Sequence, residues 1–334
     1  MNIIKNPSRE QWSTILQRPT RSFNDIENTV KEIFREVQKK GDEAVSKYTP
    51  IFDGITFENI QVTQEEISAA IALVSDDLKK SIKVAQANII KFHTAQKTDK
   101  IEVVTTQGVF CWQEKRPIQK VGLYIPGGTA PLFSTVLMLA IPAQIAGCTE
   151  IILCSPPDKS GKINPAILYT ANLCGVTKIY KVGGIQAIAA LTFGTEIIPK
   201  VYKIFGPGNQ FVTVAKQVAT QFGVAIDMPA GPSELMVVAD ETAIPAFVAS
   251  DLLSQAEHGS DSQVILITTS KETLKAVEKE LYSQIEWLPR KEIAQQAIEN
   301  SKLIYVENEL DALEIINEYA PEHLIICSKN EDFY

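Results

Sequence analysis

Residues 121–128 read Val-Gly-Leu-Tyr-Ile-Pro-Gly-Gly, a short apolar run that ends in proline and two glycines. A run of this kind, closed by turn residues, is typical of a strand buried on both faces of a parallel sheet. Similar runs follow and alternate with helical patterns, which predicts parallel strands joined by helical crossovers. We expect strands at residues 121–125, 151–154, 178–182, 201–205 and 224–226, with helices at 135–146, 165–173, 186–191 and 210–222.

A second alternating run begins after a segment rich in proline and glycine at residues 228–232. The length of 334 residues suits about two domains. The sequence therefore predicts two α/β units that meet at residues 228–232. In the second unit we expect strands at residues 235–239, 264–268, 303–306 and 324–327, with helices at 245–255, 274–284 and 310–319.

The residues before position 121 have mostly helical patterns. Apolar residues keep helical spacing up to Gly41, and Thr63 opens a capping box with Glu66 before a further apolar stripe. Residues 101–106 and 109–113 instead predict a β-hairpin.

Composition excludes several classes of protein. The hydrophobic share of 45% and the charged share of 22% are those of a globular chain and exclude general disorder. No apolar run reaches the roughly 18 residues of a membrane span, and the first residues lack the apolar core of a signal peptide. The net charge is −8 with scattered cations, which argues against nucleic-acid binding. We expect a cytoplasmic protein with neither a membrane nor a nucleic acid as partner.

The cysteines indicate packing and not a disulfide framework. Their number is odd, and none forms a Cys-x-x-Cys pair, so reduced thiols that pack in the core are expected. They are Cys111, Cys148, Cys154, Cys174 and Cys327.

Glycines and prolines cluster after three strands of the first unit, at residues 126–128, 183–184 and 206–209. Open α/β sheets bind ligands at the carboxyl ends of their strands, and helix N-termini bind anions. Gly206 and Gly208 match the start of a dinucleotide fingerprint, but Phe211 occupies the position of its third glycine. Asp227 has the spacing of a ribose-binding acid. These turns alone are compatible with a nucleotide site and equally with ordinary strand–helix turns.

The three histidines differ in their surroundings. His93 lies among polar residues and is expected on a solvated helix face. His258 ends a helix three residues after Gln255, so the two side chains share a face and can bind a metal or substrate; the alternative is a histidine favoured there by the helix dipole. His323 follows Glu322 just before a strand, which gives either a paired acid and base or an ordinary surface pair.

Ser233 follows a Pro-Ala-Gly-Pro segment and does not have the Gly-x-Ser-x-Gly setting of a nucleophile. A hydrogen-bonding or capping role is therefore expected for it.

Six segments together resemble histidinol dehydrogenase, and they occur in the order found in that family. They are VGLYIPGG at 121–128, GGIQAIAAL at 183–191, IFGPGN at 204–209, DMPAGPSE at 227–234, LSQAEHG at 253–259 and YAPEHL at 319–324. The resemblance implies two incomplete Rossmann-like parallel-sheet domains, related to the aldehyde dehydrogenase fold, with N-terminal helices. It implies a helical segment at 1–20, a discontinuous α/β domain of 21–121 plus 234–334 with the zinc and catalytic motifs, and a second α/β domain of 122–233 with the dinucleotide contacts.

The resemblance also implies an activity. Members of the family oxidise L-histidinol to L-histidine through the aldehyde in two NAD-dependent steps of histidine biosynthesis, with one zinc ion, as homodimers. By resemblance, Tyr124, Gln186 and Asn209 contact NAD. The substrate contacts are Ser233, Gln255, His258 and His323, the zinc ligands are Gln255 and His258, and the catalytic pair is Glu322 and His323.

One difference from the family concerns the end of the sequence. The family has an aspartate and then a histidine as further zinc ligands in a C-terminal tail domain, and this sequence ends at Tyr334 before either. We therefore expect weak or absent zinc binding and impaired turnover. The alternatives are a non-catalytic truncated α/β remnant that still binds dinucleotide or a partner, and a different nucleotide-binding oxidoreductase. Zinc content and histidinol-dependent formation of NADH distinguish these interpretations.

Overall fold

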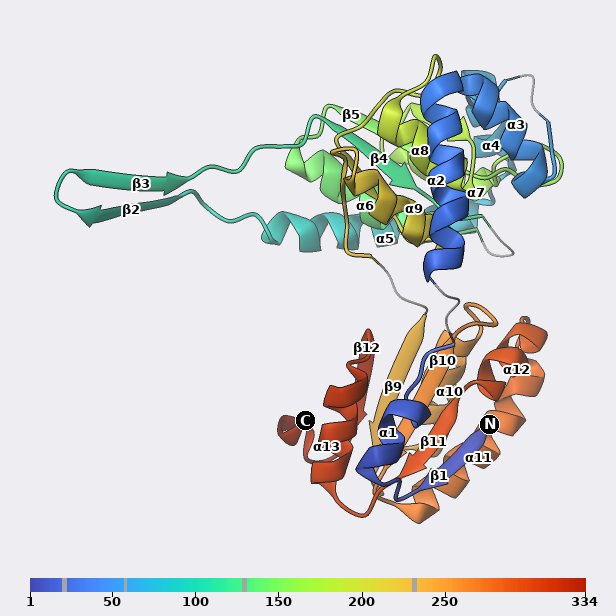
Figure 1. The fold of residues 1–334 in the computed structure, drawn as a ribbon, viewed down its shortest axis with the longest axis vertical. Coiled ribbons are helices and arrows are strands. Elements are labelled where there is room, and N and C mark those ends of the chain that lie inside the picture. The colour runs from blue at the N-terminus through green and yellow to red at the C-terminus, as the bar shows by residue number, and fades with distance from the viewer. Residues whose placement is uncertain (20–22, 57–58, 128–130, 230–232) are drawn as a thin grey trace. The chain divides into compact units, whose positions relative to one another are not determined.

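Two five-stranded parallel sheets organise the computed structural model, which describes residues 1–19, 23–56, 59–127, 131–229 and 233–334 (Figure 1). Each sheet belongs to a separate unit. Unit 1 comprises Met1–Arg21 and Ala230–Tyr334, and unit 2 comprises Ser22–Pro229. The α/β class with two parallel sheets is confirmed, and the division coincides with the predicted boundary at residues 228–232.

The sheet of unit 2 has the strand order β6-β5-β4-β7-β8, with all its pairings parallel. The crossover helices lie between consecutive strands, as the alternating pattern predicted. The strands are β4 (Lys120–Tyr124), β5 (Glu150–Ser155), β6 (Lys178–Lys181), β7 (Lys203–Phe205) and β8 (Ala225–Ile226), and the helices are α6 (Phe133–Ala146), α7 (Pro165–Leu173), α8 (Gly184–Phe193) and α9 (Gln210–Thr220).

The early helices complete both faces of this sheet. α2 (Phe23–Lys40) and α3 (Asp42–Asp53) pack with α8 and α9, whereas α4 (Gln64–Leu73) and α5 (Asp76–Ala95) pack with α7 and α6. Their apolar stripes therefore enter the two cores of unit 2, which contain Val30 and Ile33 on one face and Ile67 and Ile82 on the other.

This packing corrects the expected domain division. Residues 21–121 were predicted to join 234–334, but from Ser22 onward they belong to unit 2. The reason is that the helical stripes bury against the strands that follow them in the chain. Main-chain bonds support this grouping: Lys181 N–H donates to Ile60 O at 2.7 Å, and Val62 N–H donates to Ile179 O at 2.9 Å.

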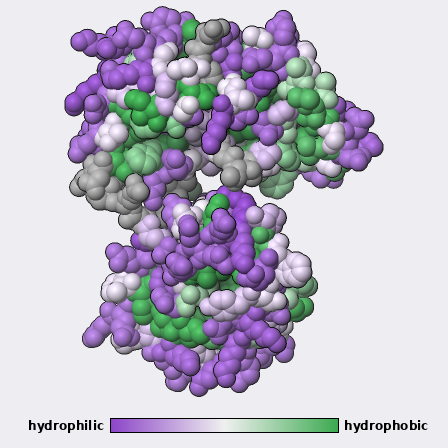
Figure 2. Space-filling model, turned by 90° about the vertical axis from the view of Figure 1, so that its right-hand side faces the viewer, coloured by the Kyte–Doolittle hydropathy of each residue, from purple (hydrophilic) through white to green (hydrophobic). Residues whose placement is uncertain are grey.

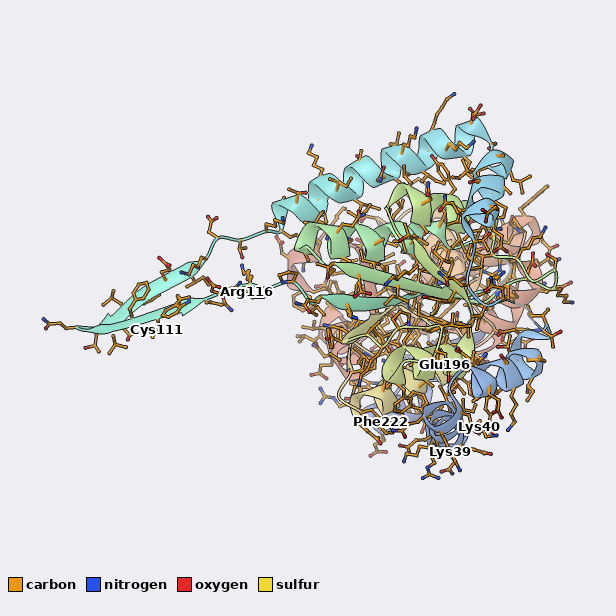
Figure 3. The ribbon with its side chains drawn as sticks, turned by 90° about the horizontal axis from the view of Figure 1, so that it is seen from above. Lys39, Lys40, Cys111, Arg116, Glu196 and Phe222 are labelled. Atoms are coloured by element: carbon orange, nitrogen blue, oxygen red, sulfur yellow. The ribbon has the colours of Figure 1, made fainter. Side chains whose placement is uncertain are left out.

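The predicted hairpin consists of β2 (Ile101–Thr106) and β3 (Val109–Gln113). Every residue of both strands is exposed. The hairpin, which carries Cys111, projects from the rest of unit 2 (Figures 1 and 3). Cys111 thus corrects the expectation that all the thiols pack in a core, whereas Cys154 and Cys174 are buried as predicted.

The sheet of unit 1 has the strand order β1-β11-β10-β9-β12, again with parallel pairings. α1 and α13 cover one face, and α10, α11 and α12 cover the other. The strands are β1 (Asn2–Lys5), β9 (Glu234–Ala239), β10 (Gln263–Thr268), β11 (Lys302–Tyr305) and β12 (His323–Cys327), and the helices are α1 (Arg9–Ile15), α10 (Pro245–Ala256), α11 (Lys271–Gln284), α12 (Lys291–Glu299) and α13 (Glu309–Tyr319).

β1 also corrects a prediction, since residues 1–20 were expected to form a helical segment. Asn2–Lys5 instead form an edge strand paired with β11, and only Arg9–Ile15 are α-helical there.

Polar side chains cover much of the displayed surface of each unit (Figure 2). Within the parts of the chain that the structure describes, no helix combines the length and apolar character needed to cross a membrane.

Candidate functional site

The predicted substrate and catalytic residues of unit 1 lie at one edge of its sheet. In register, Gln263 is opposite Glu234, and His323 is opposite Leu235, so β9, β10 and β12 begin at the same level. α10 runs back from the carboxyl end of β9 to the amino end of β10, which brings its last turn to that level. The amino edge of the sheet therefore gathers Ser233, Gln255, His258, Glu322 and His323.

Gln255 and His258 sit at the C-terminal end of α10. His258 N–H donates to Gln255 O at 3.2 Å, which closes the helix. The imidazole is exposed and Gln255 is partly buried. Neither side chain makes a hydrogen bond or ion pair with another described residue, so their polar ends are open to a ligand. Across the described ranges, no group of three or more His, Cys, Asp or Glu side chains could hold a metal ion.

Glu322 and His323 form an exposed pair. His323 Nε2 lies 4.0 Å from Glu322 Oε1, and the two side chains are 59% and 50% exposed. The Glu322 N–H donates to Glu234 Oε1 at 3.1 Å. The acid and the base are thus adjacent and reachable, while the main chain that carries them is anchored.

The predicted dinucleotide residues of unit 2 lie at the carboxyl edge of its sheet. Tyr124 ends β4, and its hydroxyl accepts from Gly184 N–H at the start of α8, at 3.1 Å. Asn209 caps α9, with Oδ1 accepting from Val212 N–H at 3.1 Å, and its side chain is exposed. Gln186 lies in the first turn of α8 and is fully buried.

Asp53 is a residue of this edge that the sequence did not indicate. Gln186 Nε2 donates to Asp53 Oδ2 at 3.2 Å. Burial raises the pKa of Asp53 to about 6, although hydrogen bonds from Gly183 and Gln186 oppose the shift. Burial also raises the pKa of Tyr124. Asp53 ends α3 without any recognisable motif, so only the packing of α3 on α8 could reveal it.

Gly206 permits a close approach of two backbones. Its φ is +133°, and a Cβ there would lie 2.1 Å from the Tyr124 carbonyl oxygen. Its N–H donates to Asp227 Oδ2 at 2.8 Å, and Lys216 Nζ donates to its carbonyl oxygen at 2.7 Å. Asp227 also pairs with Lys216. Asp227, which has the spacing of a ribose-binding acid, therefore stabilises the turn at Gly206.

His93 lies on a polar helix surface, as expected. It is on α5 in unit 2, and its Nδ1 lies 2.7 Å from Gln96 Oε1 on a solvated surface.

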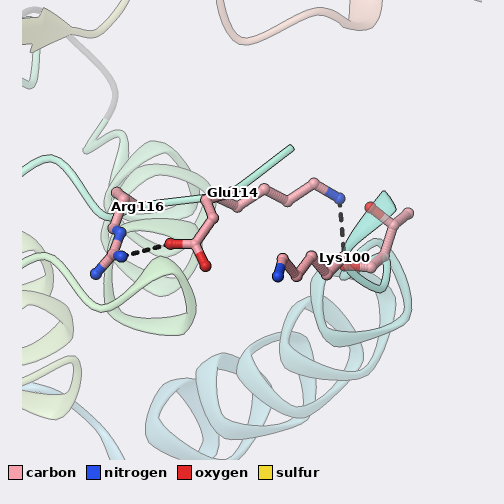
Figure 4. A pocket seen from close by; sticks show the side chains of 5 residues that line it. Lys100, Glu114 and Arg116 are labelled. Carbon is pink, nitrogen blue, oxygen red and sulfur yellow. Dashed lines mark hydrogen bonds and ion pairs between the residues drawn. The ribbon is translucent and has the colours of Figure 1, made fainter. Parts of the chain in front are cut away.

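Two surface pockets contain none of the predicted site residues. One, of about 360 Å³, lies at the base of the hairpin, where Arg116 pairs with Glu114 and Lys115 donates to Thr98 O at 3.2 Å (Figure 4). The other, of about 320 Å³, lies between α10 and Trp287. The charged side chains of the first pocket have partners nearby, since Lys100 also pairs with Glu102.

Comparison with known proteins shows the family to which the chain belongs. The protein-family model of histidinol dehydrogenase matches residues 16–334. Histidinol dehydrogenase of Bacteroides thetaiotaomicron is 57% identical over 330 residues, which are 99% of this chain and 77% of that protein. The Escherichia coli K12 enzyme is 54% identical over 324 residues, 96% of this chain and 74% of that protein.

A crystal structure of histidinol dehydrogenase from Elizabethkingia anophelis is similar throughout. The TM-score is 0.94 at 55% identity, and the match covers 100% of this chain and 77% of that chain. An unrelated nucleotide-binding oxidoreductase is thereby excluded. Because both its sequence and its fold agree with these relatives, the chain belongs to the histidinol dehydrogenase family of oxidoreductases.

Proposed function

We propose that the protein oxidises L-histidinol to L-histidine through the aldehyde, with two NAD molecules as hydride acceptors. The observation that carries this proposal is the gathering of Ser233, Gln255, His258, Glu322 and His323 at the amino edge of one sheet in a member of this family. The residues come from three segments of sequence, and the set combines a hydroxyl, an amide, a carboxylate and two imidazoles.

Gln255 and His258 have the chemistry of a zinc site. A neutral imidazole nitrogen is a common zinc ligand, and an amide oxygen is a weaker oxygen donor. Gln255 lies in the last turn of α10 and His258 in the turn that follows the helix. Neither side chain bonds to another described residue, so the two fit the role of zinc ligands. When bound, zinc would supply a Lewis acid that holds the nitrogen atoms of the substrate.

His323 would act as the base. Imidazole takes up protons near neutral pH, and this ring is exposed at the strand start. In the first step the hydroxyl proton of histidinol passes to His323 while the hydride leaves the carbinol carbon, which gives the aldehyde. Glu322 would then accept a proton from water as the water oxygen bonds to the aldehyde carbon. His323 would return its proton to the aldehyde oxygen, which completes the hydrate. Transfer of a second hydride from the hydrate carbon to NAD, with one hydroxyl proton passing to His323 and the other to solvent, would give the carboxylate.

Tyr124, Gln186 and Asn209 would form the dinucleotide site. They lie at the carboxyl edge of the sheet in unit 2, beside the N-termini of α8 and α9, where the free N–H groups of a helix favour phosphate. Gln186 Oε1 is buried and has no hydrogen-bond partner among the described residues. That acceptor and the exposed Asn209 support contact with NAD.

The assembly would be a homodimer. The β2–β3 hairpin exposes Val104, Phe110 and Trp112 at its surface. Apolar side chains on a two-stranded ribbon without its own core are favourable only when another surface covers them, and we assign that surface to a second copy of the chain.

The direct test is NADH formation with L-histidinol as substrate, together with identification of the product. Two NADH per histidine formed is the expected stoichiometry. NAD binding without any histidinol-dependent NADH would contradict the proposal and support the non-catalytic interpretation.

A further inference from the structure

An ion pair between Arg18 and the buried carboxylate of Glu234 lies beside the turn that carries Glu322 and His323. Arg18 donates through Nε and Nη2 to the two carboxylate oxygens of Glu234, with a distance of 2.9 Å from Nη2 to Oε1. The Glu234 side chain is 6% exposed. A carboxylate is costly to bury unless it is paired and hydrogen-bonded, and this one meets that condition in full.

The same two residues hold the main chain of the turn. Arg18 Nη2 donates to Tyr319 O at 2.7 Å, and Glu234 Oε1 accepts from Glu322 N–H at 3.1 Å. Between these anchors, Ala320 has φ +46°. A left-handed conformation is unfavourable for any residue other than glycine or, less often, asparagine and aspartate. The ion pair thus fixes both ends of an unfavourable turn that leads directly into His323.

Tyr319 completes the arrangement. Its ring lies against the Arg18 guanidinium, 4.4 Å from Cζ to the ring centre. Its hydroxyl lies 3.1 Å from Glu234 Oε2 and 2.9 Å from Gln263 Oε1, and it shares its one proton between these two acceptors. Burial raises the pKa of Tyr319, so the hydroxyl remains a donor at neutral pH.

We propose that Arg18, Glu234 and Tyr319 form a positioning cluster for the Glu322–His323 pair, an inference that rests on the proposed function of that pair. Glu234 begins β9 immediately after Ser233, so its carboxylate ties a substrate-contacting segment to the turn of the acid and base. None of the three cluster residues is assigned to contact substrate or cofactor. They act through the main chain that they hold.

The test compares Arg18→Ala with Arg9→Ala. Arg9 also pairs with a glutamate of α13, Glu314, but both of those side chains are exposed. We expect Arg18→Ala to lower kcat for histidinol about 10- to 100-fold, because misplacement of reacting groups by about 1 Å has effects of this size. The KM for NAD should stay within about twofold, since the dinucleotide residues belong to unit 2. Millimolar guanidinium should restore part of the rate of Arg18→Ala. The control variant Arg9→Ala should keep the kcat of the unaltered chain.

A second readout does not need activity. The chain has only three histidines, so the His323 ring signals in NMR spectra can be assigned with His93→Gln and His258→Gln variants. Arg18→Ala should move the His323 signals and leave those of His93 in place. If Arg18→Ala does not fold, Tyr319→Phe, which removes one hydroxyl group, should move the same signals by a smaller amount.

Unchanged kcat and unmoved His323 signals in folded Arg18→Ala would refute the positioning cluster. So would a loss of kcat without any movement of the His323 signals. If the unaltered chain does not oxidise histidinol but its His323 signals still depend on Arg18, the proposed function fails and the positioning inference stands.

Discussion

At the scale of single residues, the proposed function assigns one chemical step to His323 and the next to Glu322. We predict that His323→Asn lowers kcat for histidinol by about 10²- to 10⁴-fold, the usual contribution of a general base. Glu322→Gln should slow the aldehyde step more than the alcohol step, so that aldehyde is released and fewer than two NADH form per histidinol. Steady-state rates and a product assay measure both effects. His93→Gln, on the solvated face of α5, is the control and should retain full activity.

Asp53 gives a prediction about pH. Its pKa is raised to about 6 by burial, so the native state binds a proton more tightly than the unfolded chain does. As pH rises from about 4 to about 6, ionisation of Asp53 therefore costs folding stability. Asp53→Asn removes the cost of ionisation, and the asparagine Oδ1 can still accept a hydrogen bond from Gln186 Nε2. Urea unfolding should show the variant gaining stability relative to the original chain across this pH range; a pH-independent difference would contradict the assignment.

At the scale of elements, a glycine turn leads to one of the proposed dinucleotide residues, and two glycines with positive φ can be compared directly. Gly206 and Gly54 both have positive φ, but a Cβ at Gly206 would meet the Tyr124 carbonyl oxygen at 2.1 Å, whereas nothing lies within 4 Å of one at Gly54. Gly54→Ala should cost about 1–2 kcal/mol of unfolding free energy from its backbone conformation alone. Gly206→Ala should cost more and also weaken NAD binding, because the turn leads to Asn209. Equal costs in urea unfolding would contradict this account.

The elements themselves were largely predictable, because most of them have a strong local signal. The capping box of Thr63 and Glu66 forms as expected, with Glu66 N–H donating to Thr63 Oγ1 at 3.2 Å. β1 had no such signal, since its four residues pair with β11 about 300 positions later in the sequence. The network of Arg18 and Glu234 was invisible for the same reason: its partners are 216 residues apart.

At the scale of the whole molecule, the sequence predicted two α/β units but not the unit to which the helices before residue 121 belong. Motifs placed the candidate substrate and dinucleotide residues in different units, and the structure keeps them in units 1 and 2. Tyr124 and Asn209, the predicted dinucleotide residues, lie at a carboxyl edge as the rule for α/β sites expects, whereas His323 begins its strand. Helices before residue 121 could not be assigned to a sheet from sequence, because an apolar stripe does not specify which sheet buries it.

The exposed β2–β3 hairpin gives a prediction about the proposed homodimer. Trp112 on β3 is 57% exposed and stacks on Phe110, with ring centres 5.7 Å apart. Trp287 in unit 1 is 87% exposed and lies outside the hairpin, so it is a matched control. Buried tryptophans at interfaces typically contribute at least about 2 kcal/mol, which is roughly a 30-fold change in dissociation constant. We predict a dimer in sedimentation experiments that Trp112→Ser weakens by about that factor and that Trp287→Ser leaves intact. A monomeric original chain, or equal effects of the two substitutions, would show that the hairpin does not join two copies.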